Sequence, residues 1–324
     1  MRAGAPGVVF HDFEPATESF RAAVLDGLAM PQKSIPSRFF YDAEGSRLFE
    51  QICTLPEYYP TRTELALLRA HREDLAARLG RNYAIVEFGC GSSAKVRMLL
   101  DATPAPKAYL AIDISRTALL RLVDELAPAY PDIAIQAICA DYTRFDRLPE
   151  GRWAEDTRLV GFYPGSTIGN FTPDEAARFL GWVAGILGPG GALIVGIDLF
   201  KPKRLLEAAY NDTAGVTAAF NLNLLTRINR ELDGDFDLQQ FRHTAFFNAD
   251  ESRVEMHLES LCAQTVRVAG KTFSFAAGET IHTENSYKYT APAFARLAAR
   301  AGFTVDQTWI DKDGLFSLHY LRHI

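Results

Sequence analysis

Cysteine is scarce in this sequence, and the few that occur are widely spaced. The 324 residues include four cysteines, at positions 53, 90, 139 and 262, and none of them forms a C-x-x-C pair. This spacing argues against a zinc ribbon or a disulfide framework, and we expect a reduced, cytoplasmic protein. The seven histidines contain no H-E-x-x-H spacing, so we expect no catalytic metal.

Positive charge and long apolar segments are also lacking. The net charge of −6 and the pI of about 5.7 argue against nucleic acid as a partner and favour a small molecule. The sequence has no apolar run of roughly 18 residues or more, so we expect no helix in a membrane. No signal peptide and no internal repeat is visible. At roughly 100–200 residues per domain, the length predicts about two domains.

The apolar segments predict alternating strands and helices in the first two thirds of the chain. A helical pattern begins at Thr63 and is closed by Gly80, whereas the aromatic and proline-rich run 55–60 is expected to be a loop. Five continuous apolar runs are expected to be strands, at 83–88, 107–112, 133–139, 158–163 and 191–199. Three helices are expected between them, at 94–101, 116–126 and 173–187. Such strands joined by helices predict a parallel sheet that is covered on both faces.

The alternation of strands and helices stops after Phe200 and resumes near the end of the chain. Residues 203–232 look helical and residues 251–286 alternate as antiparallel strands do, before a helix and a hairpin follow at 292–321. We predict an α/β fold with a doubly wound, Rossmann-like core, whose mostly parallel sheet has an antiparallel last strand, plus an inserted α+β domain. The expected boundaries are 1–62 for the N-terminal part of the substrate-binding domain, 63–199 for the core, 200–287 for the insertion and 288–324 for the C-terminal part of the core.

The strongest chemical signal is a loop of small residues directly after the first expected strand. Gly89 and Gly91 would let the backbone approach a ligand closely. Glu87 precedes the first glycine by two positions, where a carboxylate would repel a pyrophosphate but could meet the cationic amino-acid end of S-adenosylmethionine. Because Ala94 takes the position of the third glycine in a dinucleotide fingerprint, an NAD-dependent oxidoreductase stays open as a rival.

Acidic residues also follow the next two expected strands. Asp113 ends the second strand, where a carboxylate can accept both ribose hydroxyls, and Asp141 with Tyr142 ends the third, where they suit an adenine ring. All these positions fall at the carboxyl ends of neighbouring strands, the edge at which open α/β sheets bind ligands. Together they predict a class I methyltransferase core that uses S-adenosylmethionine.

Several longer stretches resemble a particular family. They are FYDAEGSRLF at 40–49, LPEYYPTRTE at 55–64, PGSTIGNF at 164–171, YNDTAGVTAAFN at 210–221 and TENSYKY at 283–289. Together they resemble the histidine Nα-methyltransferases of ergothioneine biosynthesis, and the resemblance extends from about residue 20 to the end. That family converts L-histidine to trimethylhistidine (hercynine) by three methyl transfers to the α-amino nitrogen. Pro164 is a departure, since some members have leucine there.

The resemblance implies a role for individual residues. The implied contacts of S-adenosylmethionine are Gly89, Lys95, Asp113, Asp141 and Tyr142. The implied contacts of histidine are Tyr58, Asn170, Tyr210, Glu284 and Ser286, and Asn285 between the last two is counted with them. Met256 is implied in the side-chain pocket, and Tyr41 and the backbone of Gly165 are implied beside the accepting amine.

Other functions stay open from the sequence. Related enzymes methylate a prenylated tryptophan, so another amino acid or amine is the alternative substrate, and a non-catalytic S-adenosylmethionine sensor is a third class. We expect a monomer with L-histidine as its small-molecule partner, and no nucleic acid, membrane or metal. A carboxylate such as Glu284 can accept an imidazole N–H, and Ser286 can serve the other ring nitrogen as donor or acceptor.

Overall fold

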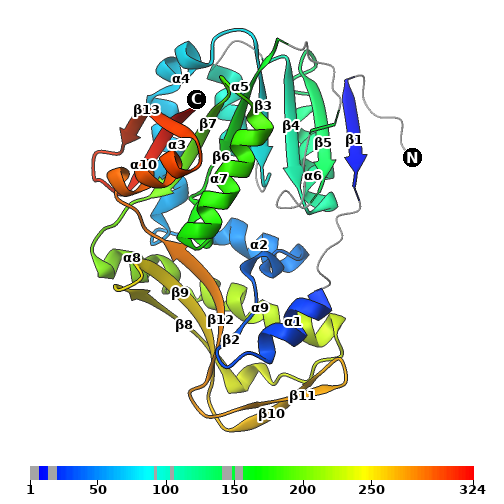
Figure 1. Ribbon diagram of the computed structural model, residues 1–324. Helices are drawn as coiled ribbons and strands as arrows, with labels where there is room; N and C mark the ends of the chain where they lie inside the picture. Colours follow the sequence, from blue (N-terminus) through cyan, green and yellow to red (C-terminus); the bar gives the residue numbers. More distant parts are fainter. Residues whose placement is uncertain (1–6, 14–19, 91–92, 103–105, 141–147, 150–155) are drawn as a thin grey trace.

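The computed structural model describes residues 7–13, 20–90, 93–102, 106–140, 148–149 and 156–324. It consists of two bodies, each built on its own sheet and stacked one above the other (Figure 1). The upper body contains an eight-stranded sheet, and the lower body contains a four-stranded sheet with a separate two-stranded ribbon.

The large sheet has the strand order β1-β5-β4-β3-β6-β7-β14-β13. Its strands are β1 (Val8–Asp12), β3 (Tyr83–Phe88), β4 (Ala108–Asp113), β5 (Ala134–Cys139), β6 (Arg158–Tyr163), β7 (Ala192–Asp198), β13 (Phe303–Ile310) and β14 (Phe316–His323). Neighbours from β1 to β7 pair in parallel, and β14 pairs antiparallel with both β7 and β13. The predicted α/β class, with an antiparallel last strand, is confirmed.

Helices cover both faces of this sheet. Side chains of α7 (Pro173–Leu187) and α10 (Ala291–Arg300) pack in one apolar cluster with the sheet. The cluster on the other face includes side chains of α3 (Tyr59–Ala70), α4 (Arg72–Leu79), α5 (Ser93–Ala102) and α6 (Arg116–Leu126). Every residue of β3 and β7 is buried, because these central strands have helices above and below them.

The chain reverses its direction of travel across the sheet between β3 and β6. From β3 it proceeds through β4 to β5, and then returns to place β6 on the other side of β3. In open α/β sheets, ligands bind at such a switch point, outside the carboxyl ends of the strands. The loops that begin at Gly89 and at Pro164 leave β3 and β6 at this point.

The small sheet has the strand order β2-β12-β9-β8, and β10 pairs with β11 beside it. The strands are β2 (Lys33–Ser34), β8 (Phe241–Asn248), β9 (Arg253–Ser260), β10 (Gln264–Val268), β11 (Lys271–Phe275) and β12 (Thr280–Tyr287). Apolar side chains of these strands form one cluster with those of the surrounding helices. The helices are α1 (Phe20–Leu28), α2 (Ala43–Ile52), α8 (Lys203–Tyr210), α9 (Val216–Glu231) and the short 3₁₀ helices η1 (Ser37–Phe40) and η4 (Leu238–Gln240).

The prediction of one helix from Thr63 to Gly80 was wrong in two respects. The helix α3 begins earlier, at Tyr59, inside the run that the sequence predicted to be a loop. Pro60 occupies the first turn of α3, where its missing N–H would have no helical partner anyway, so proline does not break the helix there. A second helix, α4, follows after a break at His71.

Two further features of the chain differ from the sequence-based expectation. The strand β1 was not predicted, and it extends the large sheet by pairing with β5. The segment 1–62 is therefore not uniform, because β1 joins the large sheet whereas α1 and α2 pack with the small one. The helical stretch predicted at 203–232 is divided into α8 and α9 by a turn that ends at Gly215, whose φ is 73°.

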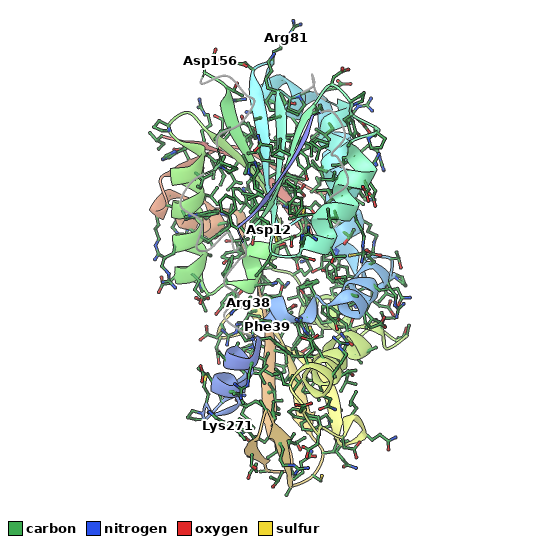
Figure 2. All side chains as sticks on the ribbon, turned by 90° about the vertical axis from the view of Figure 1, so that its right-hand side faces the viewer. Asp12, Arg38, Phe39, Arg81, Asp156 and Lys271 are labelled. Carbon is green, nitrogen blue, oxygen red and sulfur yellow. The ribbon has the colours of Figure 1, made fainter. Side chains whose placement is uncertain are left out.

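The carboxyl ends of the central strands point toward the small sheet. Figure 2 places Arg81 and Asp156, which precede β3 and β6, at the far end of the upper body, and Lys271 of β11 near the opposite end of the molecule. The switch point between β3 and β6 therefore opens toward the lower body. Among the described residues, no helix combines the length and the apolar character needed to cross a membrane.

Candidate active site

The loop after β3 and the end of β4 are joined by hydrogen bonds. The N–H of Cys90 donates to the Asp113 carboxylate over 2.9 Å, and the N–H of Ser115 donates to it over 2.7 Å. Gly89 has a φ of 81°, and a Cβ built on it would meet no atom of the described residues within 4 Å. The structure thus places Gly89 and Asp113 close together at the carboxyl ends of β3 and β4. Gly91, Asp141 and Tyr142 lie outside the described residues.

Glu87, two residues before Gly89, is buried in the structure. Its side chain is buried on the helix-covered face of β3, where the Tyr109 hydroxyl of β4 donates to the carboxylate. Burial raises the pKa of Glu87 to about 8, and the hydrogen bond from Tyr109 opposes this shift. Alternation along a strand turns Glu87 to the face opposite Val86 and Phe88, so it lies inside the sheet layer and not at the loop surface.

A buried carboxylate that the sequence analysis did not single out holds the loop after β6. The N–H of Gly165 donates to both carboxylate oxygens of Glu64, over 2.9 Å each. The ammonium of Lys95 on α5 lies 2.6 Å from the same carboxylate. A Cβ on Gly196 of β7 would lie 2.0 Å from Glu64 Oε1, so only glycine leaves room for this carboxylate. Glu64 therefore joins the helix that follows the Gly89 loop to the loop that carries Gly165.

The loop after β6 also touches the small sheet. Gly165 and Ser166 both have positive φ, of 84° and 56°, which turns the chain sharply into the 3₁₀ helix η3 (Thr167–Asn170). A Cβ on Gly169 would lie 2.9 Å from the backbone oxygen of Tyr287, so η3 lies directly against β12. Asn170, at the end of η3, is partly exposed beside this contact. The loop from Gly165 to Asn170 therefore bridges the two bodies.

A bulge in β12 decides which side chains face the lower body's interior. His282 pairs with His257, but the next paired residue, Glu284, is opposite Met256, so Thr283 is the extra residue. Without the extra residue, His282 and Glu284 would point to the same face. The bulge instead turns Glu284 to the face of β9 that carries Met256, and Ser286 follows on that face.

Asn285 is not brought together with the other predicted histidine contacts. It pairs with Glu255 on the opposite face of the sheet from Glu284, because side chains alternate along a strand. Its Oδ1 atom is buried and has no hydrogen-bond partner among the described residues.

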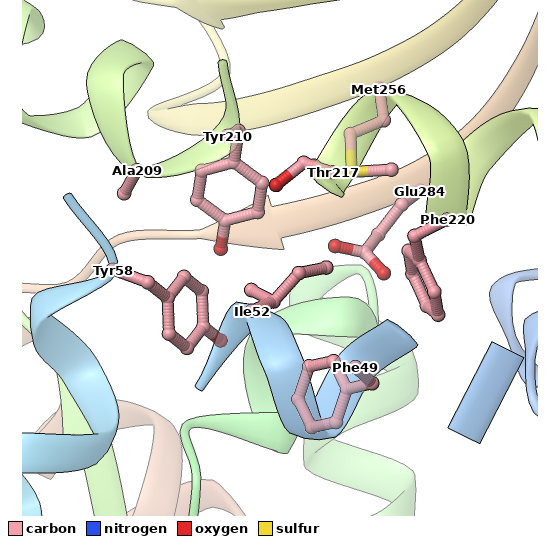
Figure 3. Close-up of a pocket in the computed structure, with 9 residues that line it drawn as sticks. All are labelled: Phe49, Ile52, Tyr58, Ala209, Tyr210, Thr217, Phe220, Met256 and Glu284. Atoms are coloured by element: carbon pink, nitrogen blue, oxygen red, sulfur yellow. The ribbon is translucent and has the colours of Figure 1, made fainter. Parts of the chain in front are cut away.

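Glu284 points into a pocket between the helices and the small sheet (Figure 3). The pocket contains about 270 Å³ of empty space, including the space open to solvent. Its lining combines aromatic rings with one carboxylate and is made of Phe49, Ile52, Tyr58, Ala209, Tyr210, Thr217, Phe220, Met256 and Glu284. Small-molecule sites typically have such apolar walls and few polar groups.

Four of the predicted substrate contacts thus line one pocket, and a fifth lies next to it, as does Tyr41, which was predicted beside the accepting amine. The four are Tyr58, Tyr210, Met256 and Glu284. Ser286 adjoins them, because the Tyr210 hydroxyl donates to its Oγ over 2.7 Å. Tyr41 is 39% exposed, and its ring meets the edges of the lining residues Phe49 and Phe220, with centroids 5.5 and 5.8 Å away.

The empty pocket makes Glu284 costly to ionise. Burial raises the pKa of Glu284 to about 7, and the Lys288 ammonium opposes this shift. A carboxylate whose pKa is raised this far by desolvation, in a pocket, is a typical sign of a functional site. A ligand that donates a hydrogen bond to the Glu284 carboxylate would lower this cost of ionisation.

This cost predicts a pH-dependent effect of Glu284→Gln on stability in the absence of ligand. Folding raises the Glu284 pKa from its ordinary value of 4.5 to about 7. The contribution of Glu284 to the free energy of unfolding of the wild type is therefore fully present below pH 4.5, and it is lost as the pH rises through 7. The free energy of unfolding of the variant should exceed that of wild type by about 1–3 kcal/mol at pH 8, after allowance for partial exposure, and not at pH 4.5. Urea unfolding at both pH values measures this. A difference that stays constant with pH would contradict the prediction.

The opposite face of the small sheet carries a second group of ionisable side chains. Ligand atoms of Glu255, His257 and His282 lie within 4.8 Å of one another. His257 donates from one ring nitrogen to Glu255 over 2.9 Å, its other ring nitrogen lies 3.1 Å from Thr280 Oγ1, and its ring stacks on His282 at 4.5 Å. Contacts within the protein account for this group, and we assign it no role in the pocket.

Four of the polar residues around the site were not singled out as site residues by the sequence analysis. Glu64 and Tyr59 belong to one of the motifs that carry the resemblance, and Lys288 belongs to another, but a motif does not reveal what a side chain contacts. Asp198, at the end of β7, has no signal beyond its position at a strand end. Their partners lie far away along the chain, as Gly165 does for Glu64 at a separation of 101 positions.

Comparison with known proteins gives a consistent result over almost the whole chain. The model of a family described as histidine-specific, S-adenosylmethionine-dependent methyltransferases matches residues 20–323. Histidine N-alpha-methyltransferase of Mycolicibacterium smegmatis is 44% identical over 312 residues, which cover 94% of this chain and 95% of that protein. The protein of the same name from Mycobacterium tuberculosis is 40% identical over 306 residues, with 93% and 94% covered. Ergothioneine biosynthesis protein 1 of Neurospora crassa is 29% identical, and the match covers 86% of this chain and 32% of that protein.

Proposed function

The chain belongs to the family of histidine-specific, S-adenosylmethionine-dependent methyltransferases, and we propose from this premise that it methylates the α-amino nitrogen of L-histidine. Three successive transfers would give trimethylhistidine for ergothioneine biosynthesis. One relative of this chain is named ergothioneine biosynthesis protein 1. The observation that carries the proposal is Glu284, which a strand bulge turns into a pocket lined by aromatic side chains. A carboxylate there matches the N–H of an imidazole ring.

The residues at the switch point fit S-adenosylmethionine. No described residue comes within 4 Å of a Cβ built on Gly89, so a ligand can approach the backbone there, and the Asp113 carboxylate at the tip of β4 suits ribose hydroxyls. We propose that these residues hold the cofactor with Lys95, Gly91, Asp141 and Tyr142. Glu87 is left out of direct contact, because its carboxylate is buried against Tyr109. When bound, S-adenosylmethionine supplies a sulfonium methyl group that a neutral amine can displace in line.

The polar residues in and beside the pocket suggest how the parts of histidine are placed. We place the imidazole ring between Glu284 and Ser286, with Met256 beside it. Tyr58, Tyr210 and Asn170 are then available to the carboxylate of histidine, since tyrosine and asparagine side chains donate hydrogen bonds. The α-amine would lie toward Gly165, whose loop bridges the two bodies.

The protein's main task in this reaction is alignment. Each methyl transfer consumes a neutral amine. Holding this amine in line with the methyl group supplies most of the increase in the rate of transfer. Tyr41 and water are the groups that can take the proton, and we place no strong general base at the site.

This view predicts a small effect of Tyr41→Phe. Because Tyr41 is 39% exposed, water can replace its hydroxyl, and kcat should fall about two- to tenfold, well short of the 10²–10⁴-fold typical of a general base. Steady-state rates with saturating histidine measure the change. A loss of about 10³-fold or more would show that Tyr41 itself transfers the proton.

Mass spectrometry of histidine after incubation with the protein and S-adenosylmethionine tests the proposed function. The expected product carries three additional methyl groups on one nitrogen. Incubation with the other amino acids, and with tryptophan derivatives, tests the alternative of another substrate. Absence of methylation with every amine, or stabilisation by NAD and not by S-adenosylhomocysteine in thermal unfolding, would refute the proposal.

A further inference from the structure

A buried asparagine on α9 lies against the bulge of β12. Asn221 and the bulged residue Thr283 are 0% and 2% exposed, and the Thr283 hydroxyl donates to Asn221 Oδ1 over 2.8 Å. The same hydroxyl lies 3.0 Å from the backbone oxygen of Met256, so its single proton is shared between the two acceptors. Asn221 Nδ2 donates to the backbone oxygen of His257 over 3.0 Å. The backbone oxygens of both β9 residues opposite the bulge therefore accept from this pair of side chains.

The second proton of the Asn221 amide leads to another wall of the pocket. Asn221 Nδ2 lies 2.9 Å from His243 Nδ1, and His243 Nε2 lies 2.8 Å from the backbone oxygen of Tyr210. Because an amide nitrogen can only donate, Nδ1 of His243 is the acceptor, and Nε2 carries the proton that goes to Tyr210. Burial lowers the pKa of His243, which favours this neutral ring. One asparagine thus connects the strand that carries Glu284 to the end of the helix that carries Tyr210.

The bulge needs such support, because a competing register is available to β12. In a regular ladder Thr283 would pair with Met256, and Glu284 would pair with Glu255 on the other face of the sheet. This shift of one residue would take the Glu284 carboxylate out of the pocket. A bulge also disrupts the hydrogen bonds of the ladder, and the side chains of Asn221 and Thr283 supply hydrogen bonds at this point.

We propose that Asn221 and Thr283 are positioning residues that determine specificity, because together they hold the bulge that turns Glu284 toward the ring of the substrate. The inference rests on the proposed function, since it takes this ring to be an imidazole. Neither residue is among those that line the described pocket, so both act through Glu284. They belong to the motifs at 210–221 and 283–289, and this role accounts for two motif residues that have no contact with a ligand in the proposed site.

Thr283→Val and Thr283→Ser test this role at the bulge. Valine keeps the shape of threonine but has no hydroxyl group, whereas serine keeps the hydroxyl group. In Thr283→Val, the ratio of kcat/KM for histidine to that for tryptophan should fall about 10- to 100-fold, the loss that follows when buried polar groups lose their partners. Most of this loss should be a rise in KM for histidine. Thr283→Ser should stay close to the wild-type ratio, since its hydroxyl can make the same contacts.

The matched variants in α9 are Asn221→Leu and Asn229→Leu. Both replace an asparagine of the same helix whose amide bonds to backbone groups, but Asn229 bonds to Phe236 after the helix and not to the bulge. Asn221→Leu should lower the histidine preference as Thr283→Val does, and Asn229→Leu should leave it unchanged. Binding of S-adenosylhomocysteine, whose proposed site lies at the large sheet, verifies that each variant is folded. If Asn221→Leu does not fold, Thr283→Val decides alone.

A double-mutant cycle with Glu284→Ala separates this role from a purely structural one. If Thr283 acts through Glu284, adding Thr283→Val to Glu284→Ala should lower the histidine preference no further. A further fall of the same size in the Glu284→Ala background would overturn the proposal. A wild-type preference in both Thr283→Val and Asn221→Leu would overturn it as well.

The wild type shows separately whether the proposed function holds. If it methylates another amine and not histidine, the proposed function fails, and a crystal structure of Thr283→Val then decides the inference about the bulge. In that structure the Glu284 carboxylate should no longer point into the pocket. An unaltered bulge with Glu284 in place would overturn the inference, whatever the substrate is.

Discussion

Replacing Glu284 with alanine is expected to abolish the preference for histidine over tryptophan. A site built to hydrogen-bond a polar group rejects a ligand that lacks it, because the site's own polar group is then left unpaired. Glu284 is the one carboxylate among the residues that line the described pocket, and the remaining lining is mostly aromatic and aliphatic. Without it, the walls favour any flat ring, and the removed side chain leaves room for an indole.

The expected size of this effect is large. The ratio of kcat/KM for histidine to that for tryptophan should fall by about 10³–10⁴-fold, and most of the loss should be on the histidine side. Competition between the two amino acids, with products counted by mass spectrometry, measures the ratio directly. Glu284→Gln should give an intermediate loss, since it keeps an acceptor oxygen but not the charge.

Asn285→Ala serves as the matched control for Glu284→Ala. It changes the next residue of the same strand, but on the face that points away from the pocket. Its histidine preference should stay within about twofold of wild type, as is usual for residues outside a binding site. Equal losses in both variants would mean that damage to β12, and not the missing carboxylate, causes the change. Unaltered selectivity in Glu284→Ala would remove the main support for the imidazole site.

Glu64→Ala is expected to damage both stability and catalysis. Glu64 has no exposed side-chain surface, and it accepts from the Gly165 N–H and the Lys95 ammonium. Removing one partner of a buried ion pair typically lowers the free energy of unfolding by about 3–5 kcal/mol, because the other charge is left without compensation. The loop at Gly165 would also lose its anchor, and a shift of about 1 Å at the accepting amine can lower the rate about 10²-fold.

Urea unfolding and steady-state rates measure the two effects of Glu64→Ala. Glu64→Gln should recover part of the rate, since its amide oxygen can still accept from Gly165, although it cannot neutralise Lys95. Glu44→Ala is the control for a surface carboxylate, because Glu44 pairs with Arg47 in the open, and it should leave the free energy of unfolding close to that of wild type. A Glu64→Ala variant as stable and as active as the Glu44 variant would contradict this account of the loop.

Local patterns in the sequence were enough to predict most of the large sheet. Continuous apolar runs identified β3 to β7, and the glycine loop after β3 identified the edge at which a ligand binds. These signals are local, because burial on both faces and positive φ each require particular residues at that position. The strand β1 escaped prediction, since it is only five residues long and is stabilised by its neighbour β5.

The motif at 283–289 predicted that β12 contributes to the site but could not predict which of its side chains do so. A simple alternation would put His282, Glu284 and Ser286 on one face. The extra residue at Thr283 breaks this pattern and separates His282 from the other two, and it is visible only when β12 is paired with β9. Asn285 was counted with Glu284 and Ser286 from the resemblance, and the paired strands place it on the other face.

By itself, the sequence determined the class of fold, the family and the residue types available for the chemistry, because these depend on the order of residues along the chain. Only the tertiary structure decided how those residues are used. It showed Glu87 buried against Tyr109, Glu64 beneath Gly165, and Asn221 bonded to the bulged residue Thr283. The physical reason is that ion pairs and hydrogen bonds in a low-dielectric interior join groups that are distant in sequence, and no local pattern records such partners.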